Sequence, residues 1–305
     1  MDRTVTTVID SKRCTGCGAC VKVCPSETIT LVGGKAVVSG QASLSCGHCA
    51  AVCPTGAVRV KALDTRSLGF HTFKIPDGWS APGTYPVADL AWVMASRRSC
   101  RNYLDRQVAK ELLEDLVRVG TLAPSGTNSQ KWTFTVLPTR QAVSHLGEKI
   151  GTYFENLNRR ASRKWLRLGL KWLGRPELDR YYRDYFESVR TALEAYRRSG
   201  RDRLFHGAPA LIIVGSKPGG SCPAEDALLA TQNILLAAHA MGLGTCLIGF
   251  AVAVMERDPN LAAFCGIPNA EKVHSAIALG YPDETYLKPT GRRPVNIRFA
   301  DDRDG

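Results

Sequence analysis

Four cysteines stand close together near the start of the chain, and their spacing is C-x₂-C-x₂-C-x₃-C-P. This pattern is typical of thiolates that hold iron–sulfur clusters, with the last thiolate turned by its proline toward a second cluster. Zinc sites more often use two separated cysteine pairs, so the spacing favours iron and sulfur over zinc or a disulfide. The first set is Cys14, Cys17, Cys20 and Cys24-Pro25, and a second set is Cys46, Cys49 and Cys53-Pro54.

The two sets lie in a repeat. Cys24-Pro25 and Cys53-Pro54 each lead through a turn into an alternating apolar segment, which predicts two copies of one unit within the first sixty residues. The Gly33-Gly34 pair predicts a hairpin inside the first copy. This unit resembles the bacterial two-cluster ferredoxin domain. The resemblance implies Cys14, Cys17, Cys20 and Cys53 on one cluster, and Cys24, Cys46 and Cys49 on the other.

One cysteine of the ferredoxin pattern is absent. Ser43 stands three residues before Cys46, where the family has the first thiolate of the second set. The serine, a water or another side chain holds that iron, or the iron is missing. We therefore expect two iron–sulfur clusters, one [4Fe-4S] and the second either [4Fe-4S] or [3Fe-4S].

Length and composition indicate two domains, because 305 residues with 44% apolar content exceed what one small unit needs. We expect the cluster-binding unit at residues 1–60, a linker rich in proline and glycine at 61–86, and a second domain at 87–305. Iron–sulfur thiolates need reducing surroundings, and the start of the chain has no apolar signal segment. The expectation is a cytoplasmic protein. The net charge of +12 favours acidic partners.

Two segments of the second domain carry side chains suited to a phosphate-bearing heterocycle. Arg97-Arg98-Ser99-Cys100-Arg101 follows a predicted helix, Val87–Ala95, and its guanidinium groups match phosphate oxygens, although such a run alone is more often a solvated turn. The polar turn 123–131 precedes a predicted strand, Trp132–Leu137. Its Asn128 and Gln130 amides pair donors with acceptors, as the edge of a heterocycle requires.

Residues 88–299 resemble the nitroreductase family of flavin mononucleotide (FMN) enzymes. The resemblance is carried, in the family's order, by the two segments above, by Gly242-Leu243-Gly244-Thr245-x-x-Ile248-Gly249, and by Leu279-Gly280-Tyr281-Pro282 with the late arginines. It implies an α+β fold, in which a ferredoxin-like domain precedes a central mixed sheet flanked by helices. Strands over Ala210–Gly215 and Ala276–Gly280, and helices over Pro223–Met241 and around Leu112–Val117, are predicted by apolar patterning.

The resemblance also implies a flavin site. Arg97, Arg98, Ser99 and Arg101 would hold the ribityl and phosphate groups, while Asn128, within the segment that includes Pro124, Ser125 and Gln130, would face the isoalloxazine edge. Ile248 and Gly249 would line its other side, and Arg292 or Arg293 would close the phosphate site. Lys131 stands where the family usually has proline, and Gly291 near a common phosphate lysine. No catalytic acid is identified.

These features predict an oxidoreductase that passes electrons from the clusters to FMN and then, as hydride, to a small electron-poor acceptor such as a nitroaromatic, quinone or activated alkene. A flavin-dependent dehydrogenase that discharges through its clusters, and an electron-transfer or redox-sensing protein without an organic substrate, are the alternatives. The expected donor is ferredoxin or flavodoxin. The family resemblance implies a homodimer, with the strand-like tail Pro294–Phe299 reaching the partner. No motif for binding nucleic acid is present.

Residues 151–206 form a basic insertion with fourteen Lys or Arg and seven Asp or Glu, which accounts for +7 of the net charge. Apolar residues alternate with cations from Arg163 to Leu173, and aromatic residues mark a second helical stretch, Leu178–Arg198. A solvated helical pair and peripheral membrane contact are alternatives to our expectation, which is a lid that favours an anionic substrate.

Overall fold

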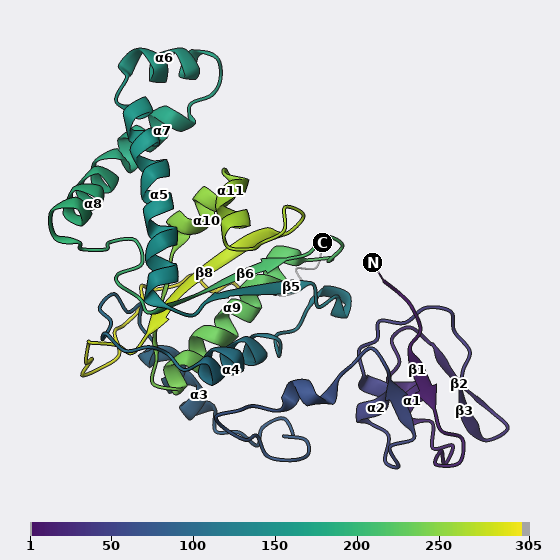
Figure 1. Cartoon of the computed structure of the whole chain (residues 1–305). Helices are drawn as coiled ribbons and strands as arrows, with labels where there is room; N and C mark the ends of the chain where they lie inside the picture. The colour runs from purple at the N-terminus through teal and green to yellow at the C-terminus, as the bar shows by residue number, and fades with distance from the viewer. Residues whose placement is uncertain (1, 301–305) are drawn as a thin grey trace.

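The computed structural model describes residues 2–300. A small N-terminal unit, here called the cluster unit (residues 2–60), is joined by a connecting segment to a larger domain (Figure 1). In the cluster unit the first strand pairs antiparallel with the last, and the predicted hairpin at Gly33-Gly34 is confirmed. The elements of this unit are β1 (Thr7–Ile9), α1 (Ala19–Lys22), β2 (Ile29–Val32), β3 (Lys35–Val38), α2 (His48–Ala51) and β4 (Val58–Val60).

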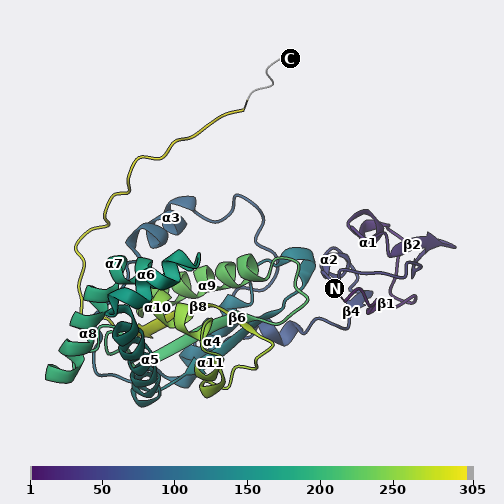
Figure 2. The same ribbon diagram turned by 90° about the horizontal axis from the view of Figure 1, so that it is seen from above.

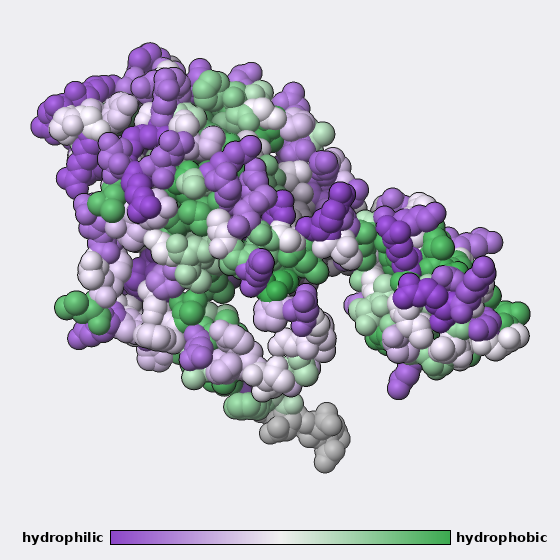
Figure 3. Space-filling view, turned by 60° about the horizontal axis from the view of Figure 1, so that its bottom comes forward, coloured by the Kyte–Doolittle hydropathy of each residue, from purple (hydrophilic) through white to green (hydrophobic). Residues whose placement is uncertain are grey.

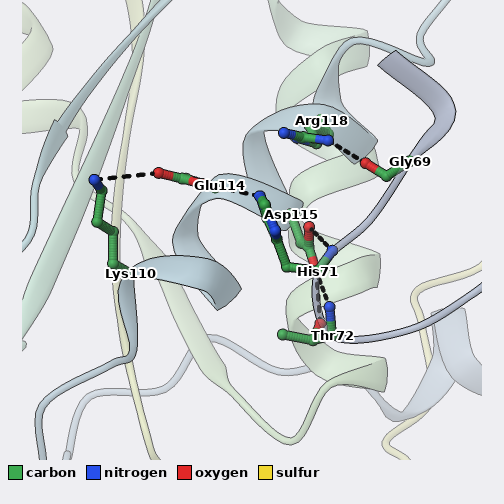
Figure 4. A network of polar contacts seen from close by, with 7 residues as sticks. All are labelled: Gly69, His71, Thr72, Lys110, Glu114, Asp115 and Arg118. Carbon is green, nitrogen blue, oxygen red and sulfur yellow. Dashed lines mark hydrogen bonds and ion pairs between the residues drawn. The ribbon is translucent and has the colours of Figure 1, made fainter. Parts of the chain in front are cut away.

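The connecting segment, residues 61–86, contains one short 3-10 helix, η1 (Thr65–Leu68). It is fastened to the larger domain by Asp115, a fully buried residue of α4 (Lys110–Gly120). The Asp115 carboxylate accepts hydrogen bonds from the backbone N–H groups of His71 (2.8 Å) and Thr72 (2.7 Å) and from the Thr72 hydroxyl (2.7 Å), as Figure 4 shows. Arg118 adds a bond to the Gly69 carbonyl.

A four-stranded sheet with the order β5-β6-β8-β7 forms the centre of the larger domain. Its strands pair antiparallel, and a parallel bridge joins Ser99 to Thr245 at the β7 edge. The predicted α+β class, with a central sheet flanked by helices, is confirmed. The sheet was expected to be mixed, but its four strands are antiparallel and only the isolated Ser99–Thr245 bridge is parallel. The strands are β5 (Trp132–Leu137), β6 (Ala210–Ser216), β7 (Gly244–Leu247) and β8 (Lys272–Gly280).

Helices cover both faces of this sheet, and β6 is therefore buried on both sides. Alternate residues of a strand face opposite ways, so Ile212 enters the core beneath α4 and α9, and Ile213 enters the core beneath α5, α10 and α11. The predicted apolar face of α4, around Leu116, packs in the first of these cores. The remaining helices are α3 (Val87–Ser96), η2 (Gly126–Asn128), α5 (Arg140–Ala161), α9 (Pro223–Ala240), α10 (Gly249–Met255) and α11 (Pro259–Phe264).

Residues 151–206 form a helical arm that continues α5 away from the sheet (Figure 1). The arm contains α6 (Lys164–Trp172), α7 (Glu177–Asp184) and α8 (Phe186–Ser199). The stretch predicted as one helix, Leu178–Arg198, is divided at Tyr185, whose φ of −132° is not helical. The ring of Tyr185 packs edge-on against Phe250 with centroids 5.6 Å apart, and this tertiary contact accompanies the break.

The C-terminal tail, from Lys288 to the last described residue, has no regular secondary structure and is exposed. Figure 2 shows it running away from the folded body. None of the helices between residues 2 and 300 combines the length and the apolarity that a membrane span needs.

Candidate functional site: two cysteine-lined cavities and an arginine cluster

The seven spaced cysteines line two small cavities of the cluster unit. One cavity is bounded by Cys14, Cys17, Cys20 and Cys53, so thiols from both repeats meet there. The other is bounded by Cys24, Cys46, Cys49 and Ser43. Among the described residues, no three His, Cys, Asp or Glu side chains converge on the position of a single metal ion. The thiols instead surround the two cavities in the same two groups that the ferredoxin resemblance implies.

The two copies of the repeat have similar backbone turns, and equivalent residues lie 29 positions apart in the sequence. Gly18 and Gly47 begin α1 and α2 with φ values of 75° and 77°, in the left-handed region that glycine adopts without strain. Gly16 (φ 75°) corresponds to Ser45 (φ 49°), so the second copy keeps the turn with a serine in place of glycine. The glycine pattern therefore shapes the loops that carry the thiols.

Backbone N–H groups point at three of the thiols. The N–H groups of Thr28, Ala36 and Ala57 donate to the sulfur atoms of Cys24 (3.3 Å), Cys14 (3.4 Å) and Cys53 (3.2 Å). Desolvation opposes ionisation of Cys53, but hydrogen bonds from Thr55, Ala57 and Val58 outweigh it and lower its pKa to about 7. Hydrogen bonds to sulfur stabilise the thiolate form, which is the form that ligates iron.

Ser43 is buried in the wall of the second cavity. Its hydroxyl oxygen accepts a hydrogen bond from the N–H of Ser45 (3.0 Å), and its own N–H donates to the carbonyl of Arg3 (2.9 Å). The hydroxyl thus occupies the place of the absent thiol and retains a free lone pair, since a hydroxyl oxygen accepts two hydrogen bonds.

Several cations gather where α3 ends. Burial lowers the pKa of Arg97, and the charges of Arg98 and Arg292 lower it further, which places the late arginine beside the 97–101 segment. Burial and Arg97 likewise lower the pKa of His239 in the last turn of α9. Within residues 2–300, Arg97, Arg98, Arg101 and Arg292 form no ion pair. An unneutralised cluster of this kind suits a phosphate group.

A polar atom without a partner lies beside these cations. Ser99 is bridged to Thr245, and Cys100 donates its N–H to the Thr245 carbonyl (2.9 Å). The Thr245 hydroxyl is buried and has no hydrogen-bond partner among the described residues. Because buried hydroxyl groups are normally paired, the position fits a polar ligand that would complete it. The residues that gather near the C-terminal end of α3 therefore fit the phosphate and ribityl groups of FMN.

The 124–130 loop lies elsewhere. Its Gly126 N–H and Ser129 hydroxyl bond to Asp226 (2.8 and 3.2 Å), in the first turn of α9, and the Ser125 hydroxyl oxygen accepts from the N–H of Gln130 (3.1 Å). Pro124 and Gln130 are exposed. The Asn128 amide faces the cluster unit, not the arginine cluster.

The remaining site residues differ in exposure. Ile248 packs its side chain in the core, and its N–H donates to the Ala276 carbonyl (2.9 Å), so only its backbone is placed toward the edge of the sheet. Gly249, Leu247 and Arg293 are exposed. Sequence reasoning missed Thr245 as an individual site candidate, although it named the segment, and it missed His239 and Asp226. No local pattern marks these three residues, since each acquires its role from packing.

A cysteine-lined module in front of an α+β domain with an anion site defines a redox protein with two kinds of centre. The family model "4Fe-4S dicluster domain" matches residues 13–58, and the model "Nitroreductase family" matches residues 94–281, more than half of the chain. The chain therefore belongs to the nitroreductase family and carries a 4Fe-4S dicluster domain in front of it. It is an oxidoreductase of that family.

Individual relatives match a similar share of the chain. The chain is 27% identical over 233 residues to 4-nitrobenzoate reductase of Nocardioides sp. (strain LMS-CY), covering 70% of this chain and 90% of the relative. It is 23% identical over 207 residues to human iodotyrosine deiodinase 1, covering 66% and 64% of the two chains. A crystal structure of a nitroreductase with bound FMN from Bacteroides fragilis NCTC 9343 superposes with a TM-score of 0.52 at 23% identity, over 70% of this chain and 99% of that one, and supports the fold.

Proposed function

We propose that the protein is an iron–sulfur flavoprotein that takes electrons into two clusters, collects them on FMN and delivers them to a small electron-poor acceptor. The observation that carries this proposal is the pair of cysteine-lined cavities within one chain that also holds the unpaired arginine cluster. When bound, the clusters supply one-electron transfer and FMN supplies hydride transfer. The chain supplies position and charge.

The phosphate of FMN is assigned to Arg97, Arg98 and Arg292, with Ser99 and Arg101 on the ribityl side. The unpartnered hydroxyl of Thr245 adds a donor or acceptor to the same place. A guanidinium group can donate two parallel hydrogen bonds to phosphate oxygens. Replacing an arginine therefore removes these hydrogen bonds as well as a positive charge. The 124–130 loop is assigned to the isoalloxazine edge, as the family resemblance implies, although the amide of its Asn128 is engaged with Leu44, Ser45 and Gln130.

We assign these two parts of the flavin site to different chains. The loop is fastened to Asp226 in the first turn of α9, while Arg97 lies near His239 in its last turn. Asp226 and His239 are 13 residues apart in α9, which corresponds to about 20 Å at 1.5 Å per residue. Because the two parts are held near opposite ends of this helix, we infer that a second copy of the chain completes the site, in the homodimer that the family resemblance implies.

The tail and α3 provide surfaces for this dimer. Although α3 is largely apolar, it buries none of its residues, and Trp92 is 67% exposed. Val295, Ile297 and Phe299 are exposed and alternate along the tail with Asn296 and Arg298. β5 is an edge strand, and beside it lies a cleft of about 600 Å³. Apolar residues of α4 and β5 line part of this cleft, together with the charged residues Lys110, Glu114 and Arg118 of α4. We assign this edge and cleft to the tail of the partner.

The acceptor is assigned to the class of small electron-poor molecules that bear a negative charge. The relative named 4-nitrobenzoate reductase supports a nitroaromatic carboxylate, and the +12 charge of the chain is compatible with an anion. Figure 1 shows α6, at the tip of the helical arm, far from α3, where the arginine cluster of the same chain lies. We therefore assign the arm as a lid over the flavin site of the partner. We place the protein in the cytoplasm, where thiolates stay reduced.

Cofactor analysis tests this function. Protein purified without oxygen is expected to contain two iron–sulfur clusters and one FMN per chain, measured as iron, acid-labile sulfide and flavin released by heat. Iron near zero with stoichiometric zinc would contradict the assignment of the cysteines. Iron and sulfide without any flavin would favour the electron-carrier alternative, whereas substrate-dependent reoxidation of reduced flavin separates the enzyme from it.

A further inference from the structure

Asn128 ties the larger domain to the cluster unit. Its side-chain N–H₂ group donates to the backbone carbonyls of Leu44 (3.3 Å) and Ser45 (3.0 Å), residues 84 and 83 positions earlier in the chain. Its side-chain oxygen accepts from the Gln130 side-chain amide (2.9 Å). Because Gln130 occupies the oxygen, the orientation of the Asn128 amide is fixed with its two hydrogens toward the carbonyls.

The loop that carries Asn128 has an unusual backbone conformation. Thr127, Asn128 and Gln130 have φ values of 53°, 54° and 47°, and residues other than glycine seldom adopt this left-handed region. The bonds from Gly126 and Ser129 to Asp226 keep the loop in this shape.

The contact selects one of the two cavities. Leu44 and Ser45 line the cavity of Cys24, Cys46 and Cys49. In the other repeat, the residues 29 positions earlier are Thr15 and Gly16, and Gly16 lies against the Gly34 backbone of the cluster unit itself. Figure 2 shows α2 at the end of the cluster unit that faces the larger domain, and the space-filling view shows the cluster unit as a separate lobe that meets the larger body at a narrow contact (Figure 3). The Ser43 cavity therefore faces the flavin loop.

The loop lies at the opposite end of α9 from the arginine cluster of its own chain. We propose that Asn128 is a positioning residue that docks the cluster unit of each protomer at the flavin whose phosphate is held by the arginines of the partner. This inference rests on the proposed function, because it needs the two-chain flavin site. Each cluster unit then serves the flavin on the opposite protomer, with the Ser43-side cavity nearest to it.

Two heterodimers with the same mutations test which chain serves which flavin. In the trans heterodimer, one chain carries Cys46→Ala and the other carries Arg97→Ala with Arg98→Ala. In the cis heterodimer, all three substitutions lie on one chain and the other is wild type. Both are assembled from differently tagged chains and should bind one FMN per dimer, at the intact arginines. Flavin content and the rate of flavin reduction are measured without oxygen.

Reduced ferredoxin, which gives up one electron per molecule, is the electron source in this assay, because dithionite would also reduce the flavin directly. Ferredoxin reduces the clusters, each of which loses one electron at a time, and two electrons with two protons from water reduce one flavin. We expect fast flavin reduction in the trans heterodimer, where the intact arginines face an intact cluster unit, and slow reduction in the cis heterodimer. The reverse order, or equal rates, overturns the inference. Absence of FMN from both heterodimers instead overturns the proposed flavin site.

A second experiment tests the docking without any turnover. Asn128→Asp keeps the oxygen that Gln130 needs but turns a second oxygen toward the two carbonyls. In the anaerobic holoprotein we expect faster amide hydrogen exchange in peptides covering residues 43–49 and unchanged exchange in the equivalent peptides at 14–20. Asn260→Asp, at an exposed residue bonded only to its neighbour Asp258, serves as the control. Unchanged exchange at 43–49 in Asn128→Asp overturns the docking role.

Discussion

Ser43 is the residue on which the nature of the second cluster depends. It lies in the cavity wall with Cys24, Cys46 and Cys49, at the place of the absent thiolate. We predict that Ser43→Cys gives a four-iron cluster in that cavity that resists oxygen better than the wild-type one, because a thiolate replaces a weaker oxygen ligand. Iron content and electron paramagnetic resonance after a timed exposure to air measure this.

Ser43→Ala is the matched comparison. We expect it to lose iron from the second cavity while the Cys14 cavity keeps its cluster. Two equally stable four-iron clusters in Ser43→Ala would show that another group holds the fourth iron and that Ser43 is not the ligand.

The cysteines were predictable from sequence because their ligation is encoded by spacing over a few residues. Structure adds that the thiols divide between two cavities in the order that the resemblance implies. The partner of Asn128 was not predictable, because its hydrogen bonds cross 84 residues of sequence and depend on how two separately folded units meet. Thr245 is a similar case, since only packing reveals that its hydroxyl has no partner.

Asp115 connects two elements, the linker and α4, through hydrogen bonds that a neutral amide cannot reproduce (Figure 4). We predict that Asp115→Asn destabilises the larger domain by about 3 kcal/mol, because the new N–H₂ group faces N–H donors and leaves buried groups unpaired. Urea unfolding measures this, with exposed Asp105→Asn as the control. Equal stability of the two variants would contradict the anchoring role.

The same network has a pH dependence. Burial of Asp115 raises its pKa, but hydrogen bonds from His71 and Thr72 outweigh burial and place the pKa below the ordinary value of 3.8. A depressed pKa means that the stabilisation is fully present above 3.8 and is lost as the pH falls through the lower, folded value. Wild-type protein should thus lose stability in strong acid more steeply than Asp115→Asn, as thermal unfolding at graded pH measures. Parallel curves would contradict this assignment.

At the level of elements, apolar patterns predicted α4, β5, β6 and α9 well, since their buried residues are visible in sequence as a periodic face or a continuous apolar run. They predicted only the second half of β8, whose strand begins at Lys272 and not at Ala276. The arm was harder. Residues 178–198 have a continuous helical pattern, yet Tyr185 interrupts it where its ring meets Phe250, a residue 65 positions away. Propensity is a weak local preference, and tertiary contacts override it.

For the whole molecule, the central expectation is a dimer in which the tail lies on the partner. We predict that Val295→Ser, Ile297→Ser and Phe299→Ser together weaken the dimer and lower FMN content, because the three side chains are 72–85% exposed in the isolated chain and would be buried only against a second copy. Analytical ultracentrifugation at graded concentrations measures the dissociation.

The opposite face of the tail supplies the control. Asn296→Ser with Arg298→Ser changes the alternate residues, which point away from the apolar face in an extended strand. This variant should dimerise as wild type does. Equal dimerisation of both variants would mean that the tail does not form the interface.

The route of the electrons through the whole molecule is the central claim. A single measurement tests it, the rate of loss of the visible flavin absorbance in the full-length holoprotein when reduced ferredoxin or NADPH is the donor, compared with the Cys46→Ala variant. If the clusters feed the flavin, reduced ferredoxin should act faster than NADPH in wild type, and Cys46→Ala should slow the ferredoxin reaction alone. Rapid reduction by NADPH, with a ferredoxin rate unchanged by Cys46→Ala, would contradict the account.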